Sequence, residues 1–521
     1  MTAVMTSIML MFAAATGKLA TVMTGALPTA GNGSTKTVTV FTPRGTIYDR
    51  NLLPMTNAQT RTVAVIEPTA AAVAAVSGQL GDNAAAALEK LRSGSPAAIE
   101  VPSDFECGDC LKYTVPLRYG EGRLASHVIG YVDALGAGVT GTEYAFDDVL
   151  GQNEPLKVTY RVDAVGRPLA GVAPEVSGSA EATAGVALTI DTQVQRLVES
   201  AAKDRLDKGA VIVMESATGR LLALASFPDY SPTAVGEALN DENAPLVNRA
   251  LSLYNVGSVF KPAVAAAALK SGISADFTDT CSGFVDVSGK VFNCHLHSGH
   301  GTLNMEQALA QSCNCYFIAL GRRTGGANIL DMCTRLGFSR SYSLAQTLTA
   351  PAGTLPGLAT LSSQPAALAN LSFGQGELML TPLHIATLVA AIANGGNLVT
   401  PSLVLGLTEG GQLKSEISPA KPRRVISGEI AGKLKQMMLY TVSSGTGRAA
   451  APEAGRAGGK TATAETGWTV SGRTIKQSWF AGFYPESGEY TVVVIREDGV
   501  GGAADCAPVF KLIADGLAQL M

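Results

Sequence analysis

The sequence has few charged residues and no basic cluster. Of its 521 residues, 16% are Asp, Glu, Lys or Arg, the formal net charge is −4, and 46% are hydrophobic. Without a basic stretch that would neutralise a run of phosphates, we expect no nucleic-acid partner. The apolar content is enough for a large core and excludes wholesale disorder. A chain of this length predicts two or three domains.

Cysteine is also scarce, with eight residues in the whole chain, so the sequence predicts no disulfide scaffold. Cys107 and Cys110 have the spacing of a redox pair or half a zinc site, but no second pair follows them. The group Cys294, His295, His297 and His300 fits no regular tetrahedral spacing and contains no carboxylate. We therefore expect no metal and no cofactor.

The N-terminus lacks the basic residues that precede a typical signal peptide. Residues 3–15 are almost wholly apolar, Lys18 interrupts the run, and residues 19–27 are again mostly apolar. A spanning helix needs about 20 apolar residues, and a lysine near its end reaches the membrane face. We predict a single-pass membrane anchor over 1–27, with a cleaved signal peptide and a buried helix as alternatives.

Internal repeats and long charge runs are absent, and two regions follow the polar linker at 28–37. The region 28–185 predicts a mixed domain, with strands near 37–40, 62–65 and 157–162 and helix over 69–92. In the region 186–521, Asp191 caps a helix, and strands are expected at 210–214, 220–226, 458–465, 478–484 and 490–496. A mostly helical stretch over 258–450 separates these strands, and a helix over 508–520 ends the chain. The order predicts an α+β fold with helices on both faces of an antiparallel sheet.

Three short motifs carry candidate chemistry. In Gly257-Ser258-Val259-Phe260-Lys261, residues three apart at a helix start share one face, so a lysine of lowered pKa would deprotonate the serine. In Ser312-Cys313-Asn314, a serine and an asparagine in one turn would both face a cleft. In Gly458-Gly459-Lys460-Thr461-Ala462-Thr463, small residues allow a substrate backbone to approach, and the lysine and threonines would hold a carboxylate. Each motif alone is weak, since all three occur by chance.

Their order is more specific. Ser258, Ser312 and Lys460 are separated by 54 and then 148 residues, and Ser-x-x-Lys, Ser-x-Asn and Lys-Thr-x in this order are typical of penicillin-binding proteins and class A β-lactamases. The chain resembles a class B penicillin-binding protein over nearly its whole length. The upstream stretches that carry this resemblance are 44–51, 138–143 and 163–167, and further matches lie at 248–250, 374–376 and 381–382.

The resemblance implies the architecture: a membrane anchor (1–27), an elongated non-catalytic pedestal domain (28–185) and a transpeptidase domain (186–521) with a five-stranded antiparallel sheet. It implies that the chain is anchored in the cell membrane with its catalytic domain outside. It also implies peptidoglycan stem peptides and lipid-linked or nascent glycan as partners, β-lactams as covalent inhibitors, and a membrane glycosyltransferase as a further partner.

The resemblance also implies the roles of the site residues. Ser258 would attack a D-Ala-D-Ala carbonyl, Lys261 would be the base, Ser312 would relay a proton, and Asn314 would hold the substrate amide. The terminal carboxylate would be bound by Lys460, Thr461, Thr463 and the adjoining Gly459. The backbone N–H groups of Ser258 and Thr463 would form the oxyanion hole.

One residue departs from the family pattern. Ala462 stands where the family usually has glycine, and its methyl group is expected to crowd the substrate. Three other functions stay open: a β-lactam sensor, a hydrolytic β-lactamase, and a catalytically weak scaffold in a cell-wall complex. A sensor or a β-lactamase would not need the upstream domain, whereas the scaffold is supported only by Ala462. The sequence does not distinguish division, elongation and spore cortex synthesis.

Overall fold

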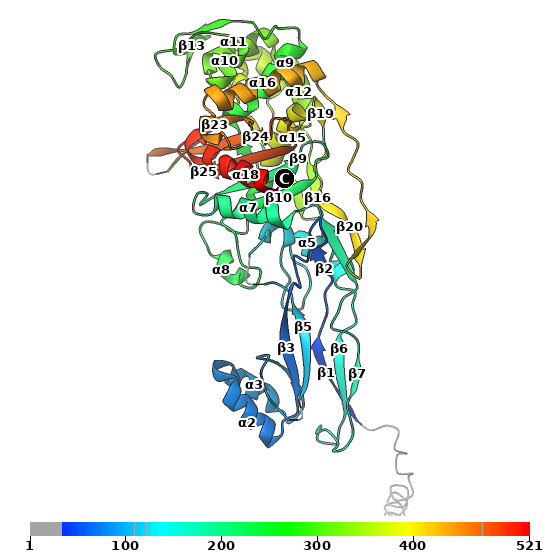
Figure 1. Ribbon diagram of the computed structural model, residues 1–521. Helices are drawn as coiled ribbons and strands as arrows, with labels where there is room; N and C mark the ends of the chain where they lie inside the picture. Colours follow the sequence, from blue (N-terminus) through cyan, green and yellow to red (C-terminus); the bar gives the residue numbers. More distant parts are fainter. Residues whose placement is uncertain (1–33, 109, 121–122, 471, 521) are drawn as a thin grey trace, which may run out of the picture. The chain divides into compact units, whose positions relative to one another are not determined.

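A computed structural model describes residues 34–108, 110–120, 123–470 and 472–520 (Figure 1). The predicted anchor at 1–27 lies outside these residues. Among the helices that the structure describes, none combines the length and apolarity that crossing a membrane requires.

The chain forms two compact units that are interleaved along the sequence. Unit 1 takes residues up to Pro43, Thr60–Pro116 and Glu154–Glu181, and unit 2 takes Arg44–Gln59, Leu117–Asn153 and Ala182–Met521. The chain therefore passes several times between the units. Two stretches of the predicted 28–185 domain pack with the C-terminal region rather than with unit 1.

Unit 1 contains two three-stranded sheets and two helices. The first sheet has the order β1 (Thr35–Phe41), β6 (Leu156–Arg161), β7 (Glu175–Ser177), and the second has the order β4 (Ala97–Val101), β3 (Gln59–Ile66), β5 (Leu111–Leu117). The helix expected over 69–92 is divided into α2 (Ala70–Gln79) and α3 (Ala84–Leu91). A 3₁₀ turn at Gly81–Asn83 separates them, because Gly81 adopts a positive φ of 50° that ends the first helix.

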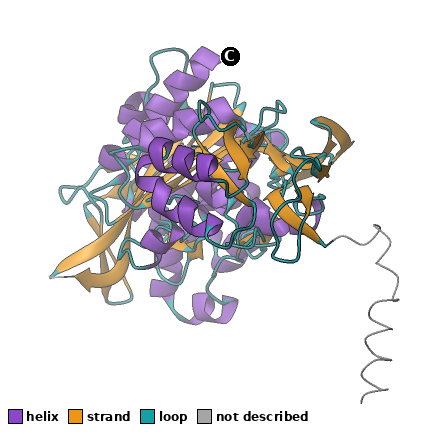
Figure 2. Cartoon of the chain, turned by 90° about the horizontal axis from the view of Figure 1, so that it is seen from below, coloured by secondary structure: helices purple, strands orange, loops and turns teal. Residues whose placement is uncertain are grey.

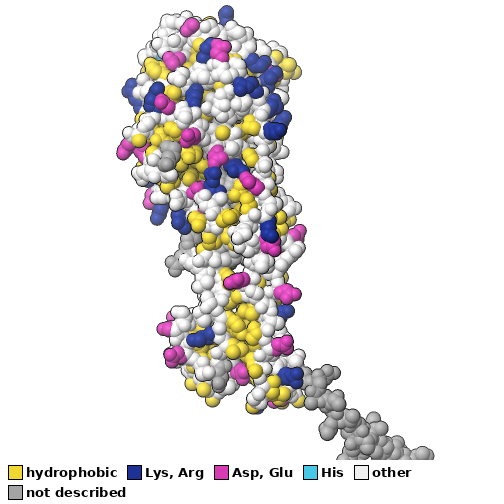
Figure 3. All heavy atoms as spheres, turned by 45° about the vertical axis from the view of Figure 1, so that its right-hand side comes forward, with side chains coloured by type: hydrophobic (Ala, Val, Ile, Leu, Met, Phe, Trp, Pro, Cys, Tyr) yellow, Lys and Arg dark blue, Asp and Glu magenta, His cyan; other side chains and the backbone are white. Residues whose placement is uncertain are grey.

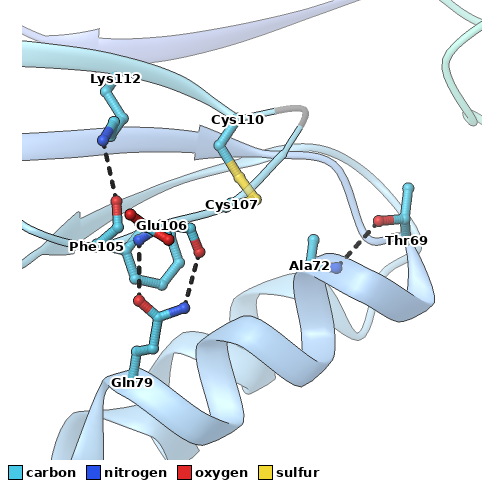
Figure 4. The surroundings of a disulfide bond; sticks show 8 residues. All are labelled: Thr69, Ala72, Gln79, Phe105, Glu106, Cys107, Cys110 and Lys112. Atoms are coloured by element: carbon cyan, nitrogen blue, oxygen red, sulfur yellow. Dashed lines mark hydrogen bonds between the residues drawn. A yellow bond between two sulfur atoms is a disulfide. The ribbon is translucent and has the colours of Figure 1, made fainter.

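Cys107 and Cys110 form a disulfide in unit 1, beside the end of α2 (Figure 4). The Gln79 side-chain amide binds both backbone groups of Glu106, the residue before Cys107. Its Nε2 donates to the Glu106 carbonyl at 2.8 Å, and its Oε1 accepts from the Glu106 N–H at 2.9 Å. Lys112 donates to the Phe105 carbonyl at 3.0 Å, and the Phe105 ring is buried. These hydrogen bonds thus join the loop that contains the disulfide to α2, and Lys112 of β5 to Phe105.

Unit 2 is built on a five-stranded antiparallel sheet. Its order is β10 (Leu221–Phe227), β9 (Gly209–Glu215), β25 (Tyr490–Glu497), β24 (Arg473–Tyr484), β23 (Gly458–Val470). Side chains alternate between two cores: Val493 and Ile495 of β25 enter one, and Val492 and Val494 enter the other. On the first face α15 (Pro382–Ala393) packs against the sheet, and on the second α7 (Thr192–Ala202) and α18 (Ala507–Leu520) do so. Figure 2 colours these helices and strands by type.

The strands of this sheet lie where the sequence placed them, and β23 and β24 extend further as a hairpin that projects from the sheet (Figure 1). Asp191 caps α7 as predicted, since its side chain accepts from the N–H groups of Gln193 and Val194. The short α17 (Gly502–Asp505) precedes α18.

The stretch 258–450 is less helical than predicted. Its helices are α9 (Lys261–Lys270), α10 (Met305–Ala310), α11 (Asn314–Thr324), α12 (Gly326–Arg335), α13 (Leu358–Ser363), α14 (Pro365–Ser372), α15 and α16 (Gly428–Ser444). Between them lie short strands: β12 (Asp279–Cys281) with β15 (Gly301–Leu303), β13 (Phe284–Val287) with β14 (Lys290–Asn293), β16 (Tyr342–Ala345) with β17 (Leu348–Ala350), and β19 (Asn397–Leu398) with β22 (Arg423–Arg424). The sequence missed these pairs because strands of two to four residues are too short to show periodicity.

A second sheet of unit 2 joins distant parts of the chain. Its order is β2 (Thr46–Tyr48), β8 (Ala184–Leu188), β20 (Val404–Glu409), β21 (Gln412–Glu416), and β2 runs parallel to β8. Nearby in sequence to β2, Arg44 pairs with the fully buried side chain of Glu143 at 2.6 Å, and Arg118 pairs with the same carboxylate at 2.7 Å. Two of the upstream motifs are therefore linked by a buried ion pair.

The remaining short helices of unit 2 are α4 (Ser126–Ile129), α5 (Gly141–Ala145), α6 (Asp147–Leu150) and α8 (Val235–Leu239). On the face drawn in Figure 3, basic and acidic side chains are interspersed. Lys433 and Glu429 form one exposed ion pair, at 2.7 Å.

Candidate active site

Ser258 lies in the turn that begins a helix, and a glycine fixes the backbone conformation just before it. The two-stranded pair of β11 (Tyr254–Asn255) and β18 (Met379–Leu380) leads into a 3₁₀ turn at Gly257–Phe260, which continues as α9. Gly257 has a φ of 57° and donates its N–H to the Gly374 carbonyl at 2.9 Å. This bond holds the backbone next to Ser258, which is half-buried and lines a cleft.

Lys261 is fully buried behind this turn. Its Nζ donates to the Ser312 carbonyl at 2.7 Å, to Ser312 Oγ at 3.3 Å and to Asn314 Oδ1 at 2.9 Å. Burial lowers the pKa of Lys261 to about 8, because the charged form loses its hydration. A substantial fraction of this amine is therefore neutral near pH 8, as a general base requires.

Ser312 is held between two lysine side chains. It lies in the turn between α10 and α11 with a φ of 53°, and Lys460 of β23 donates to its Oγ at 2.9 Å. Burial, and then the neighbouring Lys261 charge, lower the pKa of Lys460 well below its usual range. The structure thus brings Lys261, Ser312, Asn314 and Lys460 together from three separate segments.

A cleft of about 1100 Å³ in unit 2 opens over these residues. Its lining includes Ser258, Ser312, Asn314, Thr461 and Thr463. Lys460 and Gly459 are not in the lining. Gly459 is buried, and a Cβ there would lie 2.4 Å from the Phe480 ring, so its small size serves packing between strands.

Ala462 lines the cleft and also packs into the core of unit 2. It is 4% exposed and belongs to the same core as Trp479, its partner across β24. Its backbone is covered by Gly502, where a Cβ would lie 2.6 Å from the Ala462 carbonyl oxygen. Because Ala462 also lines the cleft, the predicted crowding of substrate stays a prediction.

Sequence reasoning missed other parts of the cleft. Thr446 lines it and exchanges a hydrogen bond with Thr461 Oγ1 at 2.8 Å. Asn370, Gln375 and the pair Glu465 and Lys476 also contribute to its wall. Thr446 lies two residues beyond the end of α16, and nothing in its local pattern distinguishes it from an ordinary helix end.

The fold and the three motifs define the class of the protein. An antiparallel sheet flanked by helices, with Ser258 and Lys261 at a helix start, Ser312 and Asn314 on a turn and Lys460 on an edge strand, is the arrangement shared by penicillin-binding proteins and class A β-lactamases. A family model described as the penicillin binding protein transpeptidase domain matches residues 209–515. The match covers more than half of the chain, which therefore belongs to this family.

Individual relatives agree with this assignment. Stage V sporulation protein D of Bacillus subtilis is 29% identical over 426 residues, which cover 77% of this chain and 64% of that protein. The match thus spans just under two thirds of the relative's length. Peptidoglycan D,D-transpeptidase PbpA of Mycobacterium tuberculosis is 30% identical over 366 residues, covering 63% of this chain and 72% of the relative.

Solved structures share the fold. The D,D-transpeptidase domain of a peptidoglycan glycosyltransferase from Eggerthella lenta superposes with a TM-score of 0.68 at 24% identity, covering 92% of this chain and 99% of that one. A chain in a structure of a peptidoglycan synthase complex superposes with a TM-score of 0.72 at 24% identity, covering 99% of this chain and 98% of that one.

Proposed function

We propose that this protein is a peptidoglycan D,D-transpeptidase that cross-links stem peptides through an acyl-enzyme on Ser258. The observation that carries the proposal is the convergence of two buried lysines, Lys261 and Lys460, on Ser312 Oγ at the base of the cleft that Ser258 lines. Relatives that bear the name peptidoglycan D,D-transpeptidase support it.

In the proposed reaction, the Oγ of Ser258 bonds to the carbonyl carbon of the penultimate D-Ala while neutral Lys261 takes the hydroxyl proton of Ser258. The backbone N–H groups of Ser258 and Thr463 stabilise the resulting oxyanion. Ser312 passes a proton to the departing nitrogen, the peptide C–N bond breaks, and free D-Ala leaves. The amine of a second stem peptide then attacks the ester and restores the Ser258 hydroxyl.

The other residues bind the donor. Asn314 lines the cleft beside Ser312, where its side chain meets the substrate amide. Lys460, with Thr461 and Thr463 of the same strand, binds the terminal carboxylate, whose negative charge favours the protonated form of the lysine. β-Lactams occupy the same place as mimics of the donor. Gly459 contributes by allowing the strand to pack closely. We extend the proposal to residues 1–27, which precede the described residues. They form an anchor that holds the enzyme at the cell membrane, with its cleft outside and a glycosyltransferase alongside.

Labelling with a fluorescent penicillin tests the site, and mass spectrometry of the adduct should place the label on the peptide that contains Ser258. The Ser258→Ala variant should fold normally and take no label. A label that persists in this variant would refute the assignment of the nucleophile, and an unlabelled wild-type protein would favour the scaffold.

The activity itself needs a donor and an acceptor. A pentapeptide ending in D-Ala-D-Ala, mixed with a second amine-bearing peptide, should release D-Ala and give a cross-linked product. Acylation by penicillin with no cross-linking would favour a sensor, and rapid release of hydrolysed penicillin would favour a β-lactamase.

A further inference from the structure

Four metal-binding side chains meet beside the catalytic turn. The ligand atoms of Cys281, Cys294, His300 and Cys313, here termed the Cys3His cluster, all lie within 4.8 Å of one another. The three cysteines are free thiols with at most 2% of their surface exposed, and His300 is half-buried. Three thiols and one imidazole supply a complete set of donors for a tetrahedral ion.

Three of the six ligand-to-ligand separations match a tetrahedral zinc site, and all six lie within 4.8 Å. With Zn–S bonds of about 2.3 Å and a Zn–N bond of about 2.0–2.1 Å, tetrahedral geometry requires sulfurs about 3.8 Å apart and sulfur-to-nitrogen distances of about 3.6 Å. The observed distances are 3.9 Å between the sulfurs of Cys294 and Cys313, 3.5 Å from Cys294 Sγ to His300 Nδ1, and 3.6 Å from Cys281 Sγ to the same nitrogen.

We propose that the Cys3His cluster binds one zinc ion as a structural site. Thiolates and imidazole favour Zn²⁺ among the common divalent ions, and four protein ligands leave no open position for a reacting water. Cys294 also lines the cleft, but the metal content of the cluster is independent of the proposed acyl transfer.

The ligands come from four segments, two of which are joined by the pairing of β12 with β15. Cys281 ends β12, Cys294 follows β14, His300 precedes β15, and Cys313 lies between α10 and α11. The loops already approach closely, since Cys294 donates its N–H to the Gly283 carbonyl at 2.8 Å and Gly299 leaves no room for a side chain against the Cys281 carbonyl. One ion would join both loops to the start of α11.

Cys313 connects this site to the catalytic turn. It stands between Ser312 and Asn314, the two residues that Lys261 contacts, and its sulfur accepts the Tyr316 N–H at 3.5 Å, as a metal-bound thiolate does. Ser312 has a φ of 53°, which is uncommon for a residue other than glycine. A metal bond at the next residue would hold the turn in this conformation, so the ligands would act as positioning residues for Ser312.

The sequence alone did not suggest the site. The expectation of no metal considered only the local group from Cys294 to His300. In the structure His295 and His297 of that group are not ligands, and Cys281 and Cys313 complete the set from 13 residues before Cys294 and 13 after His300.

The test is the metal content of the full chain, purified in detergent without chelators or added metal. Inductively coupled plasma mass spectrometry should find about one zinc ion per chain in the wild-type protein and almost none in Cys294→Ser, as loss of one ligand of four requires. Cys333→Ala is the matched control, because Cys333 is also a buried free thiol but lies outside the Cys3His cluster. This variant should keep its zinc.

A second measurement needs only the wild-type protein. Replacement of the ion by Co²⁺ should give the thiolate-to-metal charge-transfer absorption and the visible bands of a tetrahedral site. Wild-type protein without metal would overturn the proposal, whether its thiols are free or intact-mass analysis finds a Cys294–Cys313 disulfide. Equal zinc in Cys294→Ser and wild type would overturn it as well.

Discussion

Gly374 offers a direct test of how the nucleophile is held in place. Its carbonyl accepts the Gly257 N–H at 2.9 Å, next to Ser258. A Cβ added at Gly374 would lie only 1.9 Å from the Gly257 carbonyl oxygen, whereas real Cβ contacts are essentially never shorter than 3.0 Å. In Gly374→Ala the two backbones must therefore move apart by about 1 Å, and the turn that carries Ser258 moves with them.

The conformational cost has to be separated from this displacement. Gly374 has a φ of 85°, and alanine in this region costs roughly 1–2 kcal/mol whatever its neighbours. Gly272 has nearly the same φ, 88°, but a Cβ there meets nothing within 4 Å. Gly272→Ala is thus a matched control that carries the φ cost without the clash.

We expect Gly272→Ala to lose roughly 1–2 kcal/mol of unfolding free energy and to acylate at the wild-type rate. Gly374→Ala should be destabilised further, and its second-order rate constant for a fluorescent penicillin should fall about 100-fold, the usual effect of a 1 Å misplacement. Thermal melts and acylation time courses measure both quantities. Rates for the two variants within about threefold of each other would show that the contact with Gly374 does not position Ser258.

Three further predictions concern single residues. Ala462→Gly should lower the unfolding free energy by about 1–2 kcal/mol, from one buried methyl group and the freedom of glycine. Because Ala462 is only 4% exposed, acylation by a small penicillin and a bulky cephalosporin should change little, and acceleration of more than about tenfold for the cephalosporin would support the crowding hypothesis instead. Lys261→Arg should slow acylation by about 10²–10⁴ in the same time courses without unfolding the protein, because arginine keeps its proton; a rate within about tenfold of wild type would contradict the role as base. Burial raises the pKa of Glu199 to about 7, so the folded state holds this proton more tightly than the unfolded state and stability should fall as the pH rises from about 4.5 to 7. Urea titrations at pH 5 and 8 should show this fall, of up to about 3 kcal/mol, in wild type but not in Glu199→Gln; equal falls in both would exclude Glu199 as its source.

Features set by local pattern could be predicted from the sequence. The strands β9, β10, β24 and β25 are long apolar runs, and Asp191 has the chemistry of a helix cap. The spacing of Ser258 and Lys261 placed both near the start of a helix, although the turn that holds Ser258 is 3₁₀ rather than α. The family resemblance, rather than spacing, supplied the association of these residues with Ser312 and Lys460.

Features set by long-range packing could not be predicted. The Cys3His cluster depends on loops whose short strands carry no periodic signal, and Thr446 reaches the cleft only because α16 ends against α10. The packing of Ala462 is a related case. A strand pattern shows that alternate residues share a face, but the contacts of Ala462 with Trp479 and Gly502 depend on segments far away in the sequence.

The parallel pairing of β2 with β8 has a consequence for how the protein is made. Strand β2 ends at Tyr48, and its partner is complete only when Leu188 has been synthesised, about 140 residues later. At about 5–20 residues per second, the nascent chain carries an unpaired strand for roughly 7–28 s. The first sheet of unit 1 is likewise incomplete until β7, which ends at Ser177, has been synthesised. Unit 1 can therefore close at about the time β2 meets its partner, whereas the central sheet of unit 2 is complete only after β25, which ends at Glu497, has been synthesised.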